Sequence, residues 1–260
     1  MRVRKWLGGQ AALAAALRSV DAPVSVVGGA VRDALLERPH GPDVDLVVEG
    51  DALAVARRLG RSLGAFVVPY ERFGTARLEL PHGGEIDIVT ARREWYPAPG
   101  ALPVVEPGTL ADDLARRDFS INAMAYRVTG RDAGEIVDPH GGRRDLAGAT
   151  VRVLRDDAFV EDPSRVVRAA RYASRLRFLL DPRTAALAAG EAPRLRIDNA
   201  RVADELTRLL GEDSAAAAVA MLRRLGTPWL GPVDGLGDAF AAIDAALRRP
   251  GAPPLPAWPL

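Results

Sequence analysis

Two aspartates one residue apart are the first candidates for chemistry. Asp43 and Asp45 flank Val44 in an apolar segment, 43–48, that we expect to form a strand. Because side chains alternate along a strand, both carboxylates point to the same face. Two adjacent negative charges repel each other, so the pair needs solvent or cations, and oxygen ligands at this spacing suit Mg²⁺. The alternative is a solvated strand end without a metal.

A glycine pair in the segment VGGAVRD (27–33) joins an expected strand to an expected helix. Gly28 and Gly29 let the backbone approach a phosphate, and the helix N-terminus supplies free N–H groups. Arg32, one turn into the helix, can reach the same anion. The alternative is a plain strand-to-helix turn. A phosphate cradle about ten residues before a metal-binding pair is typical of nucleotide chemistry.

Two further charged residues lie in other apolar segments of the same region. Asp87 is part of an expected strand over 85–89 and becomes a third carboxylate for the metals if that strand neighbours 43–48. The alternative is an isolated charge on an edge strand. Arg117, in the segment RRDFSINA (116–123), is placed to meet a triphosphate. A surface cluster of ion pairs is the alternative there.

A helix that begins near Asp162 carries the last candidates. Asp162 resembles an N-cap, with Pro163 at the first helical position. Steps of three residues place Asp162, Arg165 and Arg168 on one broad polar face. A carboxylate beside a guanidinium accepts from an exocyclic amino group and donates to a ring nitrogen, a pattern that cytosine and adenine match and uracil and guanine do not. This pairing favours CTP and ATP, whereas helix capping alone is the alternative.

The positioning elements follow from the apolar patterns and their flanking turns. We expect an α/β region of about 150 residues followed by an all-helical part in which strand signals cease near residue 155. The expected elements are strands over 24–27, 43–48, 66–68, 76–80 and 85–89, a helix over 51–63 ended by Gly64, and helices near 161–178, 183–190, 200–210, 213–225 and 236–248.

Composition narrows the function classes. The chain has 260 residues, of which 48% are hydrophobic and 27% charged, which suits one large or two modest domains. The absence of cysteine excludes disulfides and thiolate metal sites, and three isolated histidines argue against a zinc enzyme. No apolar run has the length of a membrane span, and we expect a cytoplasmic protein without a membrane partner. The net charge of +1 neither demands nor forbids nucleic acid.

The chain resembles the class II tRNA nucleotidyltransferase and bacterial poly(A) polymerase family over about residues 24–210. Several independent motifs occur in the family's order. They are VGGAVRD (27–33), DVDLVVEGD (43–51), ERFGTA (71–76), IDIVTARRE (86–94), PGALP (99–103), DDLARRDFSINAMAY (112–126), DPHGGRRDL (138–146) and EDPSRVVRAARYASRLRF (161–178).

The resemblance implies an α+β fold with three parts. These are a small nucleotidyltransferase head with a mixed sheet (1–150), an all-helical neck that recognises the base (151–210) and a short helical body with a proline-rich end (211–260). It also implies that Asp43 and Asp45 hold the metal and that Asp87 supports catalysis. The implied nucleotide-binding residues are Gly28, Gly29, Arg32, Arg117, Asp162, Arg165, Arg168 and Arg171.

The implied activity is template-independent addition of C, A or both, from CTP and ATP, to the 3′ end of tRNA. Two Mg²⁺ ions would assist the attack and the release of pyrophosphate. A CC-adding, A-adding or poly(A)-adding relative is the nearest alternative, and no residue separates these specificities. A non-catalytic nucleotide- or RNA-binding regulator is a second. Since only about 50 residues follow residue 210, a homodimer or a partner protein is expected to supply further tRNA-binding surface.

Overall fold

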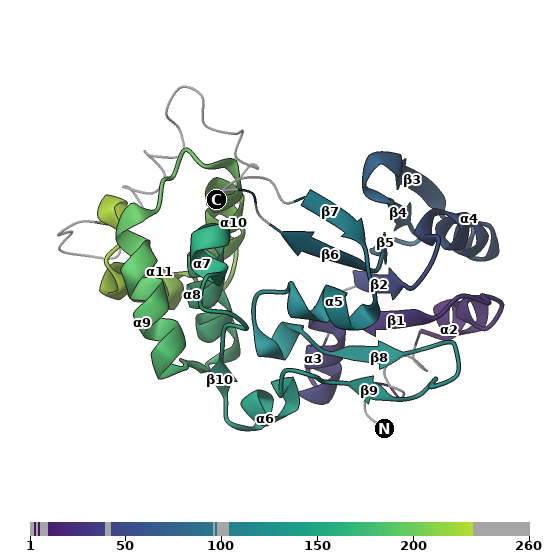
Figure 1. Cartoon of the computed structure of the whole chain (residues 1–260), viewed down its shortest axis with the longest axis horizontal. Coiled ribbons are helices and arrows are strands. Elements are labelled where there is room, and N and C mark those ends of the chain that lie inside the picture. The colour runs from purple at the N-terminus through teal and green to yellow at the C-terminus, as the bar shows by residue number, and fades with distance from the viewer. Residues whose placement is uncertain are drawn as a thin grey trace. The chain divides into compact units, whose positions relative to one another are not determined.

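A computed structural model gives the fold of two separate parts of the chain (Figure 1). The structure describes residues 10–39, 43–95 and 104–230, together with the single residues 3, 5 and 97. Among them, residues up to 95 and residues 104–146 form one compact unit, and residues 147–230 form a second. The division falls close to the expected end of the head at residue 150. The further boundary at 210 stays a prediction.

A seven-stranded sheet organises the first unit. Its strand order is β3-β4-β5-β2-β1-β8-β9. The β2–β5 pair is parallel and the other neighbours are antiparallel, which confirms the mixed sheet. The strands are β1 (Val24–Val27), β2 (Val44–Val48), β3 (Phe66–Tyr70), β4 (Thr75–Glu79), β5 (Glu85–Thr90), β8 (Ala125–Arg127) and β9 (Ile136–Val137), and a separate hairpin pairs β6 (Arg92–Trp95) with β7 (Val104–Pro107).

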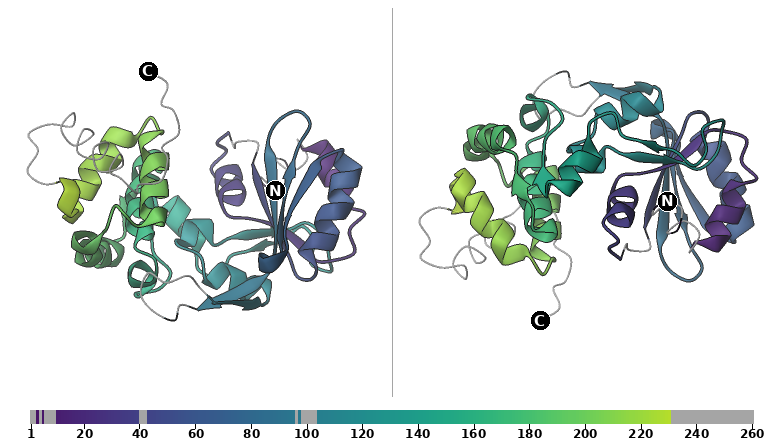
Figure 2. Two further views of the ribbon diagram at one scale, coloured as in Figure 1. Left: turned by 90° about the horizontal axis from the view of Figure 1, so that it is seen from above. Right: turned by 90° about the horizontal axis from the view of Figure 1, so that it is seen from below.

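Two helices, α2 (Ala11–Leu17) and α4 (Ala52–Leu63), pack against each other, and α4 covers one face of the sheet (Figure 2). The side chain of Asp51 caps α4 by accepting from the N–H of Ala54. Gly64 ends the helix in the left-handed conformation that glycine adopts at little cost. The predicted helix over 51–63, ended by Gly64, is therefore confirmed.

Alternating apolar residues of the strands face α4. Leu46, Leu78 and Ile88 are each fully buried there. Gly60 lets the helix approach the sheet closely, because a Cβ at this position would lie 2.5 Å from Cγ2 of Val67. The core of the first unit therefore depends on a small residue at the helix–sheet contact as well as on large apolar side chains.

The opposite face of the sheet is covered only in part. Helix α5 (Leu110–Ala115) places Leu110 and Leu114 in a buried cluster with Val27 and Val47 of the two central strands. Helix α3 (Gly29–Leu35) follows β1 and contacts β1 and β2. The part of this face over β2, β5 and β4 carries charged side chains instead, and the candidate site lies there.

The second unit consists mainly of helices. One exception corrects the expected all-helical neck, because β10 (Thr150–Val151) pairs in parallel with β11 (Leu179–Leu180). Arg177 ends α8 with φ +59°, which turns the chain out of the helix and leaves residues 179–180 extended. The helices are α7 (Ala158–Glu161), α8 (Ser164–Leu176), α9 (Pro182–Glu191), α10 (Ala200–Leu210) and α11 (Ala215–Leu225), and α6 (Gly142–Ala147) lies where the two units join in sequence.

Two predictions concern the end of the chain, and the structure does not test them. The predicted helix near 236–248 and the proline-rich end lie outside the described residues. No helix in the described parts of the chain combines the length and the apolar composition that a membrane crossing requires.

Candidate active site

Charged side chains lie in register across three strands of the first unit. Asp45 on β2 is the register partner of Asp87 on β5, and Asp87 is the partner of Arg77 on β4. Register partners present their side chains on the same face of a sheet, so the three form one row. Asp43 directly precedes β2, and its Oδ1 accepts from the N–H of Glu85 at 3.2 Å. The expectation that the Asp87 strand neighbours the aspartate pair is confirmed.

Asp87 is held by an arginine within this row. Nε and Nη2 of Arg77 donate to its two carboxylate oxygens at 2.9 and 3.2 Å, and Nη1 lies 2.9 Å from Glu85. The hydrogen bond to Asp87 is the main cause that raises the pKa of Arg77. No group of three or more potential metal ligands forms among the described residues, so the expected third metal carboxylate is not met. A catalytic role of Asp87 stays a prediction.

Gly28 brings a carboxylate and a guanidinium together. The chain turns from β1 into α3 at this residue, with φ +68° and ψ −129°. A Cβ here would lie 3.0 Å from Nη1 of Arg117 and 3.6 Å from Oδ2 of Asp45. Two predicted site residues that are far apart in sequence therefore border the same glycine. The guanidinium of Arg117 can bind a phosphate, and the carboxylate of Asp45 can bind the cation that accompanies it.

The carboxylate oxygens of Asp43 and Asp45 are ligands that suit Mg²⁺. Asp43 and Asp45 are both exposed, although the other residues of β2 are buried. Mg²⁺ is commonly held by one or two carboxylates together with waters and substrate phosphates, so a cage of three protein ligands is not required. Gly28 keeps the space beside Asp45 clear of a side chain. Asp43 and Asp45 therefore remain the residues expected to hold the ion.

A buried aspartate orients Arg116 and Arg117. It was not predicted from the sequence. Asp113 is fully buried and accepts from Nε and Nη2 of Arg116 at 3.0 and 2.6 Å. It also accepts from Nε and Nη2 of Arg117 at 3.2 and 2.9 Å. This leaves Nη1 of Arg117 directed toward Gly28. Arg116 and Arg117 follow Asp113 by three and four residues, a spacing that could have predicted both ion pairs.

Arg32 lies behind the site rather than on its surface. It is only 2% exposed, Nε and Nη2 donate to Asp33, and Nη1 donates to Oδ1 of Asn122 at 2.6 Å. Asn122 in turn donates to Asp118 at 3.1 Å. Arg32 thus ties α3 to the segment that follows Arg117. Its predicted contact with a nucleotide, like that of Gly29, the first residue of α3, stays a prediction.

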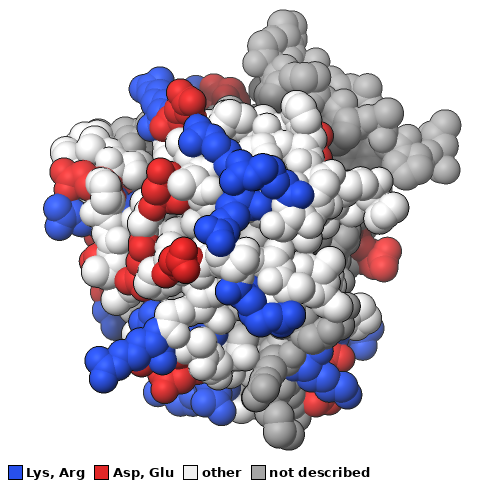
Figure 3. All heavy atoms as spheres, turned by 90° about the vertical axis from the view of Figure 1, so that its right-hand side faces the viewer, with Lys and Arg blue, Asp and Glu red and all other residues white. Residues whose placement is uncertain are grey.

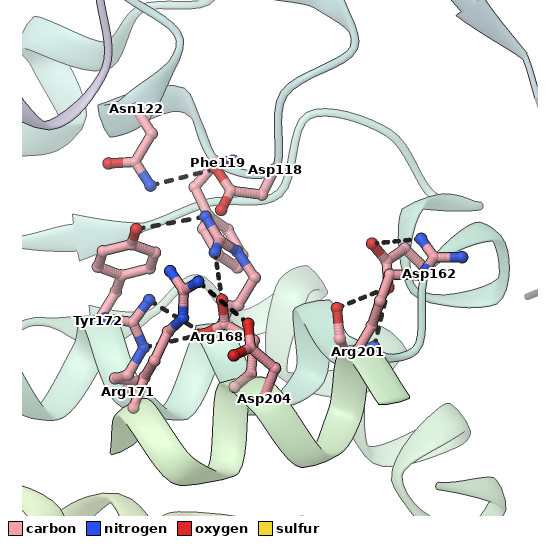
Figure 4. Close-up of polar contacts among 12 residues, drawn as sticks. Asp118, Phe119, Asn122, Asp162, Arg168, Arg171, Tyr172, Arg201 and Asp204 are labelled. Carbon is pink, nitrogen blue, oxygen red and sulfur yellow. Dashed lines mark hydrogen bonds and ion pairs between the residues drawn. The ribbon is translucent and has the colours of Figure 1, made fainter. Parts of the chain in front are cut away.

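Asp162 is engaged by two elements of the second unit (Figure 4). Its Oδ1 accepts from the N–H of Ser164 at 3.1 Å and from its hydroxyl at 2.6 Å. The predicted N-cap is wrong by one residue, because Pro163 is the N-cap of α8 and Asp162 is the C-cap of α7. Its Oδ2 accepts from Nη1 of Arg201, on α10, at 3.0 Å. The helix begins at Ser164, one residue after Pro163. Arg165, one turn further on, is 6% exposed.

Arg168 and Arg171 share one carboxylate that the sequence reasoning also missed. Glu205 of α10 accepts from Nη1 of Arg168 at 2.6 Å and from Nε of Arg171 at 3.0 Å. Both guanidiniums also lie over the ring of Tyr172, at 5.3 and 4.6 Å from its centroid (Figure 4). Glu205 is 5% exposed and lies on the apolar face of α10, where an unpaired charge would be costly. A glutamate on the apolar face of a predicted helix could have indicated a buried ion pair.

Comparison with known families agrees with this geometry. Residues 24–152 match the family described as the Poly A polymerase head domain. The chain belongs to this family. The match contains the sheet, Gly28, the aspartate pair and Arg117. Gly28 and the Asp45 and Arg117 side chains beside it therefore lie within the domain that this chain shares with the Poly A polymerase head family.

Relatives extend the similarity beyond the head domain. The A-adding tRNA nucleotidyltransferase of Aquifex aeolicus is 44% identical over 207 residues, which are 76% of this chain and 24% of that protein. The CC-adding tRNA nucleotidyltransferase of Deinococcus radiodurans is 43% identical over 213 residues, 82% of this chain and 56% of that protein. A solved structure of a CCA-adding enzyme in apo form II superimposes with a TM-score of 0.73 at 37% identity, covering 82% of this chain and 51% of that one. The chain thus spans between a quarter and just over half of these relatives.

A Gly28→Ala variant of this head domain is expected to be less stable and slower in nucleotide transfer. Its φ and ψ lie in a region that is essentially restricted to glycine, so we expect the free energy of unfolding to fall by about 1–3 kcal/mol. The new methyl group would also displace Arg117. Urea unfolding and a transfer assay measure both effects. Gly190→Ala is the control, because a Cβ there meets nothing within 4 Å; equal behaviour of the two variants would contradict the prediction.

A Glu205→Gln variant is expected to destabilise the second unit by about 3 kcal/mol, because it leaves two guanidiniums without their shared charge. Thermal unfolding followed by circular dichroism measures the loss. Asp204→Asn, on the same helix, removes an exposed ion pair with Arg208 and is expected to change stability by less than about 1 kcal/mol. A Glu205→Gln protein as stable as Asp204→Asn would refute the structural role of this carboxylate.

Proposed function

We propose that this chain is a nucleotidyltransferase that adds C, A or both, from CTP and ATP, to the 3′ end of tRNA. The observation that carries the proposal is the meeting of Asp45 and Arg117 at Gly28, since a metal-binding carboxylate beside a phosphate-binding guanidinium is what a nucleoside triphosphate requires. Similar proteins support the substrate. They include A-adding and CC-adding tRNA nucleotidyltransferases, and one solved relative is described as complexed with a primer tRNA and an incoming ATP analog.

Asp43 and Asp45 would hold Mg²⁺, and the bound ion supplies Lewis acidity to the 3′-hydroxyl and to the triphosphate. Arg117 donates from Nη1 to an oxygen of the triphosphate, and Asp113 keeps its guanidinium in that orientation. Gly28 leaves the space that a phosphate occupies. The 3′-hydroxyl of the primer loses its proton to solvent as O3′ forms a bond to the α-phosphorus, the bond to the leaving oxygen breaks, and pyrophosphate departs.

Recognition of the base is assigned to Asp162 and Arg165. Arg201 holds Oδ2 of Asp162, and Ser164 holds Oδ1. Because an ionised carboxylate offers about four acceptor sites, Asp162 can still accept from the exocyclic amino group of cytosine or adenine. Arg201 then acts as a positioning residue for this carboxylate. Arg168 and Arg171, aligned by Glu205, are assigned to the triphosphate.

Base specificity is tested with the purified chain, Mg²⁺ and each radiolabelled nucleoside triphosphate in turn. The primers are a tRNA that ends before CCA, a tRNA that ends in CC and an unrelated single-stranded RNA. Addition of C to the first, of A to the second, or of both supports the proposal and states the specificity. Long runs of A on every RNA would identify a poly(A) polymerase instead. Binding of nucleotide without any transfer would favour the non-catalytic regulator.

The remaining expectations about partners are not addressed by this geometry. A homodimer or a partner protein that supplies further tRNA-binding surface stays a prediction, as does the cytoplasmic location. Sedimentation of the purified chain with and without tRNA would test the first, with a monomer in both samples arguing against the homodimer.

A further inference from the structure

The outward side of α4 carries positive charge and small side chains, and Arg18 directly follows α2. The buried stripe of α4 is apolar, and its outward stripe reads Ala54, Arg57, Arg58, Arg61 and Ser62. Neither helix contains an acidic residue. Figure 3 looks onto the side of the molecule where α4 lies and shows Lys and Arg side chains gathered near its middle, with acidic side chains to their left and at several edges of this face.

Within the described parts of the chain, few carboxylates balance the charge of these arginines. No described residue forms an ion pair or hydrogen bond with the side chain of Arg18, Arg57 or Arg61, and all three residues are exposed. Arg58 reaches the hydroxyl of Ser19 at 3.4 Å and Asp21 at 3.8 Å, whose side chain is 99% exposed. By contrast, three exposed arginines of the second unit each pair with a carboxylate; they are Arg183 with Asp156, Arg194 with Glu191 and Arg196 with Asp198.

Folding does not account for this arrangement. Like charges three and four residues apart on a helix repel each other, and Arg57, Arg58 and Arg61 have that spacing. The core of the first unit is filled by the opposite side of α4 and makes no use of these side chains. The charge is therefore available for a ligand outside the chain, and a polyanion would relieve the repulsion.

We propose that Arg18, Arg57, Arg58 and Arg61, here called the outer arginine surface, bind the phosphate backbone of an RNA duplex. Guanidiniums form bidentate hydrogen bonds to phosphates. A rise of 1.5 Å per residue puts Arg57 and Arg61 about 6 Å apart along α4, so two phosphates can be held at once. The outer arginine surface lies over the sheet face opposite to Asp43 and Asp45 and is thus separate from the proposed transfer site.

The chemistry of the neighbouring residues favours this ligand over two others. Single-stranded RNA is held by aromatic side chains that stack on its bases, whereas the outward positions of α4 carry alanine, arginine and serine. Membrane-surface helices insert large apolar residues such as Leu, Phe or Trp, whereas Leu53 and Leu63 of α4 are half-buried and its exposed positions hold no such residue. Small side chains beside the arginines permit a backbone to approach closely. The choice of RNA rather than another polyanion rests on the proposed function.

The test is binding of a fluorescent RNA hairpin whose 3′ end is blocked, so that no nucleotide can be added. Anisotropy is measured with the whole chain at salt concentrations from about 50 to 200 mM. The variant carries Arg57→Gln, Arg58→Gln and Arg61→Gln. The control carries the same change of net charge at paired positions, namely Arg183→Gln, Arg194→Gln and Arg196→Gln. Thermal unfolding of both is recorded, and relief of like-charge repulsion predicts no loss of stability in the first variant.

We expect the first variant to bind the hairpin about 10- to 30-fold more weakly and to lower the slope of log Kd against log salt by about 2 to 3, while the control stays close to wild type. Unchanged affinity and slope in the first variant would overturn the proposal, whatever its transfer activity. A wild-type chain that binds no hairpin but adds nucleotides to tRNA would overturn it too and leave the proposed function standing. Loss of binding to anionic phospholipid vesicles with hairpin binding intact would assign the surface to a membrane instead.

Discussion

An Asp45→Asn variant is expected to lose nucleotide transfer by at least about a thousandfold, because several kcal/mol of charge stabilisation depend on the metal site. The substitution keeps the size of the side chain but removes the negative charge beside Gly28 and Arg117. Asp45 is exposed within an otherwise buried strand, so the fold should tolerate the change. Single-turnover transfer to a tRNA primer measures the loss, and circular dichroism verifies the fold.

Asp132→Asn is the matched control for this variant. Asp132 is exposed in the turn between β8 and β9 of the same unit, and its substitution changes the net charge by the same amount. We expect its transfer rate to equal that of the wild type. If Asp45→Asn retained more than about a tenth of the wild-type rate, the metal site would have to lie elsewhere.

An Asp113→Ala variant is expected to lower the free energy of unfolding of the first unit by about 3–5 kcal/mol, since it removes the buried carboxylate that Arg116 and Arg117 share. Single domains are stable by about 5–15 kcal/mol, so this unit should become marginal. Arg117 would also lose its orientation toward Gly28, which should raise the KM for the nucleoside triphosphate. Urea unfolding followed by fluorescence, together with steady-state transfer kinetics, measures both effects.

Two further variants keep this prediction testable. Asp112→Ala, next in sequence, removes a capping box with Thr109 and should cost only about 1 kcal/mol. Asp113→Asn keeps the shape of the side chain and serves if the alanine variant does not fold. The account would be contradicted if Asp113→Ala and Asp112→Ala were equally stable and had the same KM.

Local patterns predicted the elements that position the site. The capping Asp51 and the terminating Gly64 mark the ends of α4, and apolar, β-branched segments mark β1, β2 and β5 to within two residues. These signals act within one turn or one strand, so they can be seen in sequence. The two-residue strand β11 was missed, because it depends on the left-handed Arg177 and on a partner 29 residues earlier.

The site was predicted in part, for a similar reason. Asp45, Gly28 and Arg117 are brought together as their residue types suggested. The partners of charged residues were not predicted, since Arg77 takes up both oxygens of Asp87 only because strand order places them side by side. The burial of Arg32 depends in the same way on a neighbour 90 residues away. Which ion pairs form is a property of tertiary packing and has no periodic signal in the sequence.

Asp45 and Arg117 are expected to act together on the phosphates of one nucleotide at Gly28. A double-mutant cycle tests it most directly, using calorimetric binding of a non-hydrolysable CTP or ATP analogue to wild type, Asp45→Asn, Arg117→Gln and the double variant. With Mg²⁺ present, the account predicts a coupling of at least about 1 kcal/mol between the two substitutions, and without Mg²⁺ a coupling near zero. Additive losses with Mg²⁺ present would contradict it.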